Sequence, residues 1–233
     1  MLGVIVNFAA ILIGGGIGLL VKKGVPERFS TAIMAGIGLC VLFVGISGAL
    51  SGGSTINLII SIVLGVTTGT ALKIDERLNW LGQKIEQKVS PNGKIEGKPS
   101  ISQGFVTASL LFCVGAMAIV GSINSGLVGD HSVLFTKSTI DMISALILAV
   151  TLGVGVLFSA GAVLIYQGLI VLLAHALRPL LESYSLIAEI NGAGSLLIIA
   201  LGLNMLGLTK IKVADFLPAI FFAPLVYYVS GLF

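Results

Sequence analysis

Apolar segments long enough to cross a lipid bilayer follow one another along almost the whole chain. The 233 residues are 56% hydrophobic and only 10% charged. A soluble domain of this length could not remove so much apolar surface from water. In lipid, backbone N–H and C=O groups have no water to bind, so each segment must satisfy them internally as a helix. The sequence therefore predicts an all-α fold, a polytopic transmembrane helical bundle.

Eight segments are expected to span the membrane: 3–21, 29–50, 55–72, 103–123, 139–158, 162–177, 187–206 and 213–231. A helix that rises about 1.5 Å per residue needs roughly 20 residues to cross a hydrocarbon core about 30 Å thick. The run from Thr139 to Ala176 is long enough for two spans, and we expect a tight turn near residues 159–161. The first segment ends at Lys22-Lys23 rather than at a small-residue cleavage site, which indicates a span rather than a cleaved signal peptide.

Basic residues predict the orientation, because cytoplasmic loops carry an excess of lysine and arginine. In the eight-span arrangement 11 of the 13 Lys and Arg residues lie on one side, and only Lys137 and Arg178 on the other. We therefore expect a multi-pass protein of the cell inner (plasma) membrane. Both of its termini are expected on the outer side of that membrane. If residues 139–177 formed a single span, Lys210 and Lys212 would lie outside, with nine basic residues inside and four outside. Eight spans give the stronger asymmetry and are therefore favoured.

The chain is expected to form a single membrane domain over residues 1–233, with a three-span part at 1–72 and a five-span part at 101–233. Between them, residues 73–100 are charged. Their first half has the spacing of one apolar helix face: Ile74, Leu78, Leu81, Ile85 and Val89. This amphipathic helix lies either at the membrane surface or on loops of its own protein, and a turn-rich linker follows it.

Segments of the three-span part resemble segments of the five-span part. Residues 54–69 align without gaps with residues 138–153, so that Asn57 is opposite Asp141. Ile5, Asn7 and Gly18 align with Glu189, Asn191 and Gly202 at one common offset. The paired spans run in the same direction in the eight-span arrangement, so any internal repeat is parallel. Chance similarity between apolar segments and true duplication are equally good explanations, and repeats are common in transporters.

Polar side chains within the spans form the candidate binding site. An ionisable side chain at a helix centre costs on the order of 3 kcal/mol on insertion scales, so it needs a partner or a wet cavity. Five polar residues are expected at comparable depth toward the outer leaflet: Asn7, Asn57, Asp141, Glu189 and Asn191. Together they could replace the hydration shell of a cation or hold an amine.

The same residues also have a structural interpretation. Asp141 can pair with Lys137 one helical turn earlier, Glu189 can lie in water at headgroup level, and the asparagines can join helices. The GxxxG spacing of Gly14 and Gly18 predicts close helix packing.

Enzyme and cofactor motifs are missing from the sequence. His131 and His175 are the only histidines, and neither has a nucleophile–base motif or metal-ligand spacing around it. Cys40 and Cys113 lie in the middle of apolar segments, so we expect neither a disulfide nor a metal site. We therefore predict no enzymatic activity, no catalytic residue, no cofactor and no bound metal.

Residues 112–123, Phe-Cys-Val-Gly-Ala-Met-Ala-Ile-Val-Gly-Ser-Ile, resemble the YqgA/YdfK-type family of uncharacterised bacterial inner-membrane proteins, DUF554. The likeness covers nearly the whole chain and includes Asp141, Glu189 and the Tyr166-Gln167-Gly168 segment. It implies a multi-pass bacterial plasma-membrane protein whose molecular activity is not established. It implies no substrate and no catalytic residue.

Two functions follow from these observations. The first is a small transporter or channel-like carrier for a small solute or cation, with Asp141 and Glu189 as charge partners and the asparagines as neutral ligands. The second is a non-transporting membrane scaffold or interaction protein that binds anionic lipid or a cytoplasmic partner through residues 73–100. The expected partners are the lipid bilayer and a small cation or polar solute, but no nucleic acid. A homo-oligomer is left open.

Overall fold

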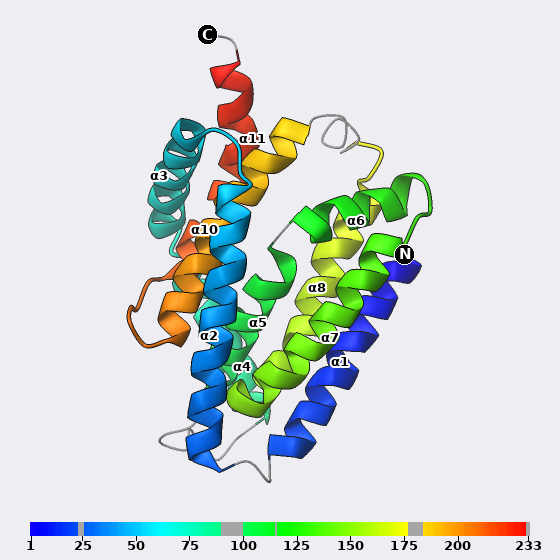
Figure 1. Ribbon diagram of the computed structural model, residues 1–233, viewed down its shortest axis with the longest axis vertical. Coiled ribbons are helices and arrows are strands. Elements are labelled where there is room, and N and C mark those ends of the chain that lie inside the picture. The colour runs from blue at the N-terminus through cyan, green and yellow to red at the C-terminus, as the bar shows by residue number, and fades with distance from the viewer. Residues whose placement is uncertain (23–25, 90–99, 115, 177–183, 232–233) are drawn as a thin grey trace. The chain divides into compact units, whose positions relative to one another are not determined.

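Helices are the only regular elements in the residues that the computed structural model describes, which are 1–22, 26–89, 100–114, 116–176 and 184–231 (Figure 1). The all-α prediction is confirmed. Six helices are each long and apolar enough to cross a membrane, and the number rises to eight if two bent helix pairs each count as one span. The predicted polytopic bundle is thus confirmed, with eight spans as its upper count.

The chain divides into two compact units that each take helices from distant parts of the sequence. Unit 1 contains Met1–Met34, Arg77–Cys113 and Met117–Leu177. Unit 2 contains Ala35–Glu76, Val114–Ala116 and Arg178–Phe233. The first helix therefore packs with the middle of the chain, whereas the second and third helices pack with its C-terminal part.

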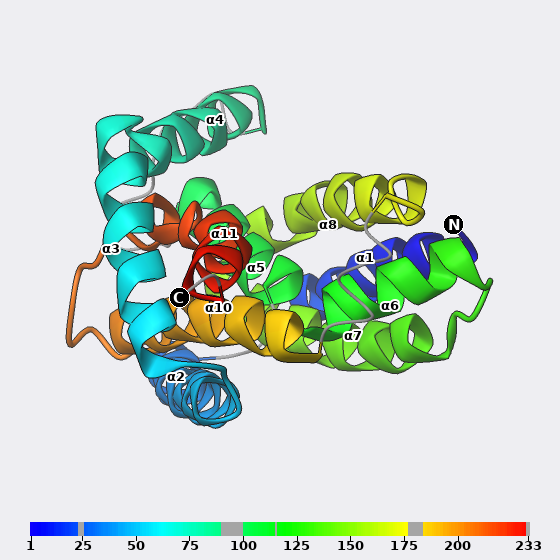
Figure 2. The same cartoon turned by 90° about the horizontal axis from the view of Figure 1, so that it is seen from above.

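Unit 1 is built on α1 (Leu2–Lys22), which contacts both α7 (Ser132–Leu152) and α8 (Gly155–Leu172) (Figures 1 and 2). Helices α1 and α7 run parallel: Gly3, near the start of α1, packs against Leu134 near the start of α7, and Gly18 packs against Leu146 further along it. Helix α8 runs the opposite way along α1. Helix α5 (Ile101–Cys113) packs on α8, and the helical segment that follows it is bent by 61° relative to α5. Most of α6 (Ala116–Leu127) and of α4 (Ile74–Val89) also belongs to unit 1.

The turn between α7 and α8 lies at Gly153, not near residues 159–161 as predicted from the sequence. Gly153 has φ 78°, a left-handed conformation that glycine adopts at little cost and that ends helices. Ser159 is instead inside α8, where its buried hydroxyl donates to the Val156 carbonyl at 2.6 Å. Two separate helices are thus confirmed, but α7 begins earlier than predicted and Asp141 lies near its middle.

Unit 2 contains most of α2 (Glu27–Leu50), then α3 (Thr55–Ala71), α10 (Tyr184–Met205), the 3-10 helix η1 (Val213–Phe216) and α11 (Ala219–Ser230). Helix α11 contacts both α3 and α10 (Figure 2). Helix α2 is antiparallel to α10, since Gly38 lies at Leu206 and Gly48 at Ser195. These helix directions within each unit agree with those of the eight-span arrangement.

Large apolar side chains cover the outside of both units, while polar side chains lie inside. Leu20 and Phe43 are each 73% exposed and Phe221 is 76% exposed, whereas Asn7 and Gln167 are fully buried. Soluble proteins show the opposite distribution. This distribution is expected where lipid is the solvent, because apolar side chains lose nothing in contact with lipid tails.

Candidate functional site

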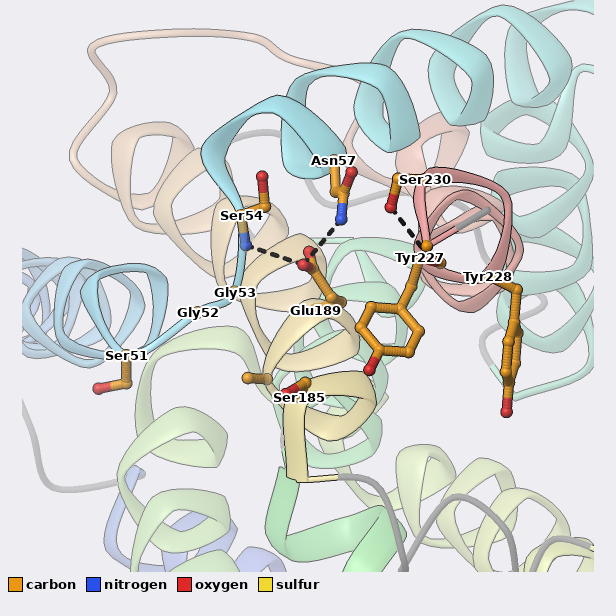
Figure 3. Close-up of a pocket in the computed structure, with 12 residues that line it drawn as sticks. Ser51, Gly52, Gly53, Ser54, Asn57, Ser185, Glu189, Tyr227, Tyr228 and Ser230 are labelled. Atoms are coloured by element: carbon orange, nitrogen blue, oxygen red, sulfur yellow. Dashed lines mark hydrogen bonds between the residues drawn. The ribbon is translucent and has the colours of Figure 1, made fainter. Parts of the chain in front are cut away.

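An open pocket with a volume of about 770 Å³ lies wholly within unit 2. Its size falls in the range of roughly 300–1,000 Å³ that is typical of small-molecule sites. It is formed by the α2–α3 loop, the first turn of α3, the start of α10 and the end of α11 (Figure 3). The lining residues are Ser51, Gly52, Gly53, Ser54, Asn57, Ser185, Ala188, Glu189, Tyr227, Tyr228, Ser230 and Gly231.

Glu189 is the charged side chain of this pocket. Its Oε1 accepts hydrogen bonds from the Ser54 backbone N–H at 2.8 Å and from Asn57 Nδ2 at 3.0 Å (Figure 3). Both donors belong to the N-terminal end of α3, where the helix dipole stabilises a negative charge. A carboxylate has about four acceptor positions, and the described residues give Oε2 no hydrogen bond. Glu189 therefore keeps acceptor capacity toward a ligand.

Two glycines allow the α2–α3 loop to come this close to α10. A Cβ atom at Gly53 would overlap the Glu189 carboxyl group. A Cβ atom at Gly52 would lie 3.1 Å from the Cα of Gly192. The Gly-Gly sequence is thus what brings the Ser54 N–H within reach of Glu189.

A second polar cluster is buried between α1, α7 and α8 of unit 1. Lys137 Nζ lies 2.6 Å from Asp141 Oδ2. Asn7 Nδ2 donates to the same oxygen at 3.0 Å and to Gln167 Oε1 at 3.3 Å. Each of the four residues is at most 6% exposed, and among the described residues Asn7 Oδ1 and Gln167 Nε2 have no hydrogen-bond partner. The cluster joins three helices and has hydrogen-bonding capacity left over.

Four of the five site residues predicted from the sequence form two hydrogen-bonded pairs, and the fifth, Asn191, belongs to neither. Asn7 bonds to Asp141 in unit 1, and Asn57 bonds to Glu189 in unit 2. Asn191 does not line the pocket; it donates to the Gly48 carbonyl of α2 at 3.3 Å. This hydrogen bond joins α10 to α2.

Lys137 and Gln167 belong to the unit 1 cluster, although neither was among the predicted site residues. Lys137 was expected in an outside loop, but it is buried more than one turn inside α7. It can lie there because Asp141, one turn later, neutralises its ammonium group, and this i, i+4 spacing is visible in the sequence. The signal for Gln167 was weaker, a single amide in an apolar segment.

Comparison with known proteins identifies the family of this chain. The family described as "Protein of unknown function (DUF554)" matches residues 2–228. The chain belongs to the DUF554 family. This confirms the resemblance seen at residues 112–123. No solved structure was found to match the chain.

Two DUF554 relatives match the chain over almost its full length. The "Uncharacterized membrane protein YdfK" of Bacillus subtilis (strain 168) is 30% identical over 237 residues, which cover 100% of this chain and 98% of that protein. The "Uncharacterized protein YqgA" of Escherichia coli (strain K12) is 29% identical over 223 residues, which cover 96% and 94%. The chain is therefore a membrane protein of a family whose name specifies no substrate. Its function has to be inferred from the side chains of the DUF554 site.

The two clusters of this DUF554 protein differ in charge balance. In unit 1 Asp141 is neutralised by Lys137. In unit 2 Glu189 has no basic partner among the described residues, and those residues contain no group of three or more His, Cys, Asp or Glu that could hold a metal ion. The unit 2 pocket is therefore the place where a cationic group would meet an acid that is not yet neutralised.

Proposed function

We propose that the protein carries a small cation or polar solute across the membrane. One observation carries the proposal: Glu189 is a buried carboxylate that lines an open pocket and has no basic partner among the described residues. Ionisable residues in membrane segments are costly and commonly mark substrate or ion pathways. In this proposal Glu189 meets the solute and no enzymatic step is involved.

The arrangement of helices adds support for a carrier built from parallel repeats. The alignment of Asn57 with Asp141 makes α3 and α7 equivalent helices, and the second alignment does the same for α1 and α10. The α1–α7 contact of unit 1 then corresponds to the α10–α3 contact of unit 2, and each of these two contacts contains an amide–carboxylate hydrogen bond, Asn7 to Asp141 and Asn57 to Glu189. The acid comes from α7 in unit 1 and from α10 in unit 2. We therefore propose the internal repeat together with the transport function.

Transport should depend on Glu189. We expect Glu189→Gln, which keeps the shape of the side chain but removes its charge, to lower uptake at least about tenfold, the equivalent of about 1.4 kcal/mol of lost interaction. The measurement is flux into proteoliposomes for a panel of inorganic cations, amines and amino acids. Glu76→Gln is the matched control, because Glu76 is an exposed acid whose ion pairs lie at the surface. Flux that Glu189→Gln leaves unchanged would refute the site.

The eight-span orientation places the α6–α7 loop outside and the α10–η1 loop inside. Val128 in the first loop is 75% exposed and Leu208 in the second is 69% exposed. After both native cysteines are replaced by alanine, Val128→Cys should react with an impermeant maleimide on intact cells. Leu208→Cys should react only after the cells are opened. Labelling of both positions on intact cells would contradict eight spans with both termini outside.

A scaffold is the second function, and the surface of α4 favours it. Trp80 is 56% exposed, and Lys84 Nζ lies 3.9 Å from the centroid of its ring. A tryptophan beside a lysine is typical of helices at the membrane–water interface. Residues 90–99 of the predicted linker, which was expected at 90–100, lie outside the described residues. A scaffold would show no Glu189-dependent flux, so the transport measurement separates the two functions.

A further inference from the structure

We infer that the pocket of unit 2 binds a small organic ammonium ion, with its cationic group between Glu189 and Tyr227. The inference rests on the proposed function, because it names the class of solute that the same pocket takes. Three properties of the pocket carry it: its charge, its size and its aromatic wall.

The charge of the pocket selects a cation. Glu189 is 4% exposed, and its Oε1 is held by Ser54 and Asn57. These donors fix the carboxylate in place without neutralising it, and the described lining residues include no lysine, arginine or histidine. An anion would be repelled, and a neutral solute would leave a buried charge without a partner. A ligand with one positive charge matches the single carboxylate.

The size of the pocket favours an occupant larger than a bare inorganic ion. A volume of about 770 Å³ is many times the roughly 30 Å³ that one water molecule occupies in the liquid. A hard cation such as calcium needs about six to eight oxygen ligands at close range. The described lining residues offer one carboxylate, and no metal-holding group of three or more acidic, His or Cys residues occurs in the described part of the chain. An ammonium group with carbon substituents fills such a space better.

The aromatic wall supplies the second attraction for an ammonium ion. Tyr227 lies beside Glu189 in the pocket (Figure 3). Its ring packs edge to face with that of Tyr228, with centroids 5.7 Å apart and an angle of 70°. A quaternary ammonium group is attracted to an aromatic face within about 6 Å of its centre. The nearby serine hydroxyls can accept hydrogen bonds from polar substituents of the ligand.

Choline and its neutral carbon isostere 3,3-dimethyl-1-butanol are the matched probes, because they differ in the charged nitrogen and hardly in shape. Binding to the purified full-length chain in detergent would be measured by isothermal titration calorimetry at constant ionic strength. We expect saturable binding of choline, and binding of the isostere at least about tenfold weaker. Sodium and potassium chloride, added as competitors, should not displace choline beyond their effect on ionic strength.

Variants assign the binding to the two side chains. Glu189→Gln should weaken choline binding at least about tenfold, whereas Tyr227→Leu should weaken it about fivefold, the equivalent of one cation–π contact. Tyr227→Phe keeps the ring and should bind choline like the unchanged protein. Size-exclusion profiles and thermal midpoints that match the unchanged protein would show that each variant is folded.

Equal binding of choline and its isostere would overturn the inference, as would displacement of choline by sodium or potassium at equal concentration. If choline does not bind but a solute without an organic ammonium group shows Glu189-dependent uptake into proteoliposomes, the ammonium class is wrong and the transport function stands. If choline binds through Glu189 and no solute crosses the membrane, the binding site stands and the transport function is wrong.

Discussion

Replacing Asp141 by leucine should lower the free energy of unfolding by about 3–5 kcal/mol, the usual cost of removing one partner of a buried ion pair. The substitution leaves the Lys137 ammonium group buried without its partner 2.6 Å away. It also removes the carboxylate oxygen that accepts a hydrogen bond from Asn7. Lys137→Met should have a similar cost, because it leaves the carboxylate of Asp141 uncompensated among apolar helices.

The double variant Lys137→Met/Asp141→Leu should cost clearly less than the sum of the two single variants. It leaves no unpaired charge, and a buried ion pair can often be replaced by apolar residues with little loss of stability. The comparison also controls for the larger volume of leucine, which is present in one single variant and in the double variant. Equilibrium unfolding in mixed detergent micelles, followed by circular dichroism, measures all three. Additive losses would show that the two side chains do not act as a pair.

An exposed ion-pair system in the same protein provides a surface control for this experiment. Glu76 lies 3.7 Å from Lys73 and 3.4 Å from Lys212, and its side chain is 54% exposed. Because water screens such pairs, Glu76→Gln should change the free energy of unfolding by less than about 1 kcal/mol. A loss as large as that of Asp141→Leu would mean that burial is not what makes the unit 1 pair important.

Hydropathy predicted the helices well because lipid requires every span to be an apolar helix that satisfies its own backbone hydrogen bonds. It placed the α7–α8 turn wrongly because small residues such as Ser159 and Gly161 are tolerated inside membrane helices, where helices pack closely. The actual turn depends on one residue, Gly153 with φ 78°, and a single glycine does not lower the apolar character of a long segment. Hydropathy likewise does not show the bend between α5 and the helical segment after it, because the bend falls within one predicted span.

The two clusters differ in how far the sequence could predict them. Lys137 and Asp141 are local, since they lie one turn apart on α7, so their spacing was enough to suggest the pair. The pocket around Glu189 is formed by three segments that are distant in the sequence. Their proximity comes from the packing of α2, α3, α10 and α11, and no local pattern reports it. Tyr227 therefore became a candidate ligand-binding residue only in the folded structure.

The contact between α1 and α7 should be as sensitive as the buried ion pair. A Cβ atom at Gly14 would overlap the carbonyl group of Met142, and one at Gly18 would overlap that of Leu146. Backbone atoms cannot turn aside as a side chain can, so the helices themselves must separate. We expect Gly14→Ala and Gly18→Ala each to lower the free energy of unfolding by about 3 kcal/mol, the upper part of the usual range for overpacking.

Gly16 is the matched control on the same helix. A Cβ atom at Gly16 would have no other atom within 4 Å, and alanine favours a helix over glycine by up to about 1 kcal/mol. Gly16→Ala should therefore leave the thermal midpoint unchanged or raise it, although the chemical change is the same as at Gly14. Equal losses at all three positions would mean that α1 does not meet α7 through this face. The parallel packing that brings Asn7 to Asp141 would then be wrong, because the same face of α1 carries Asn7, Gly14 and Gly18.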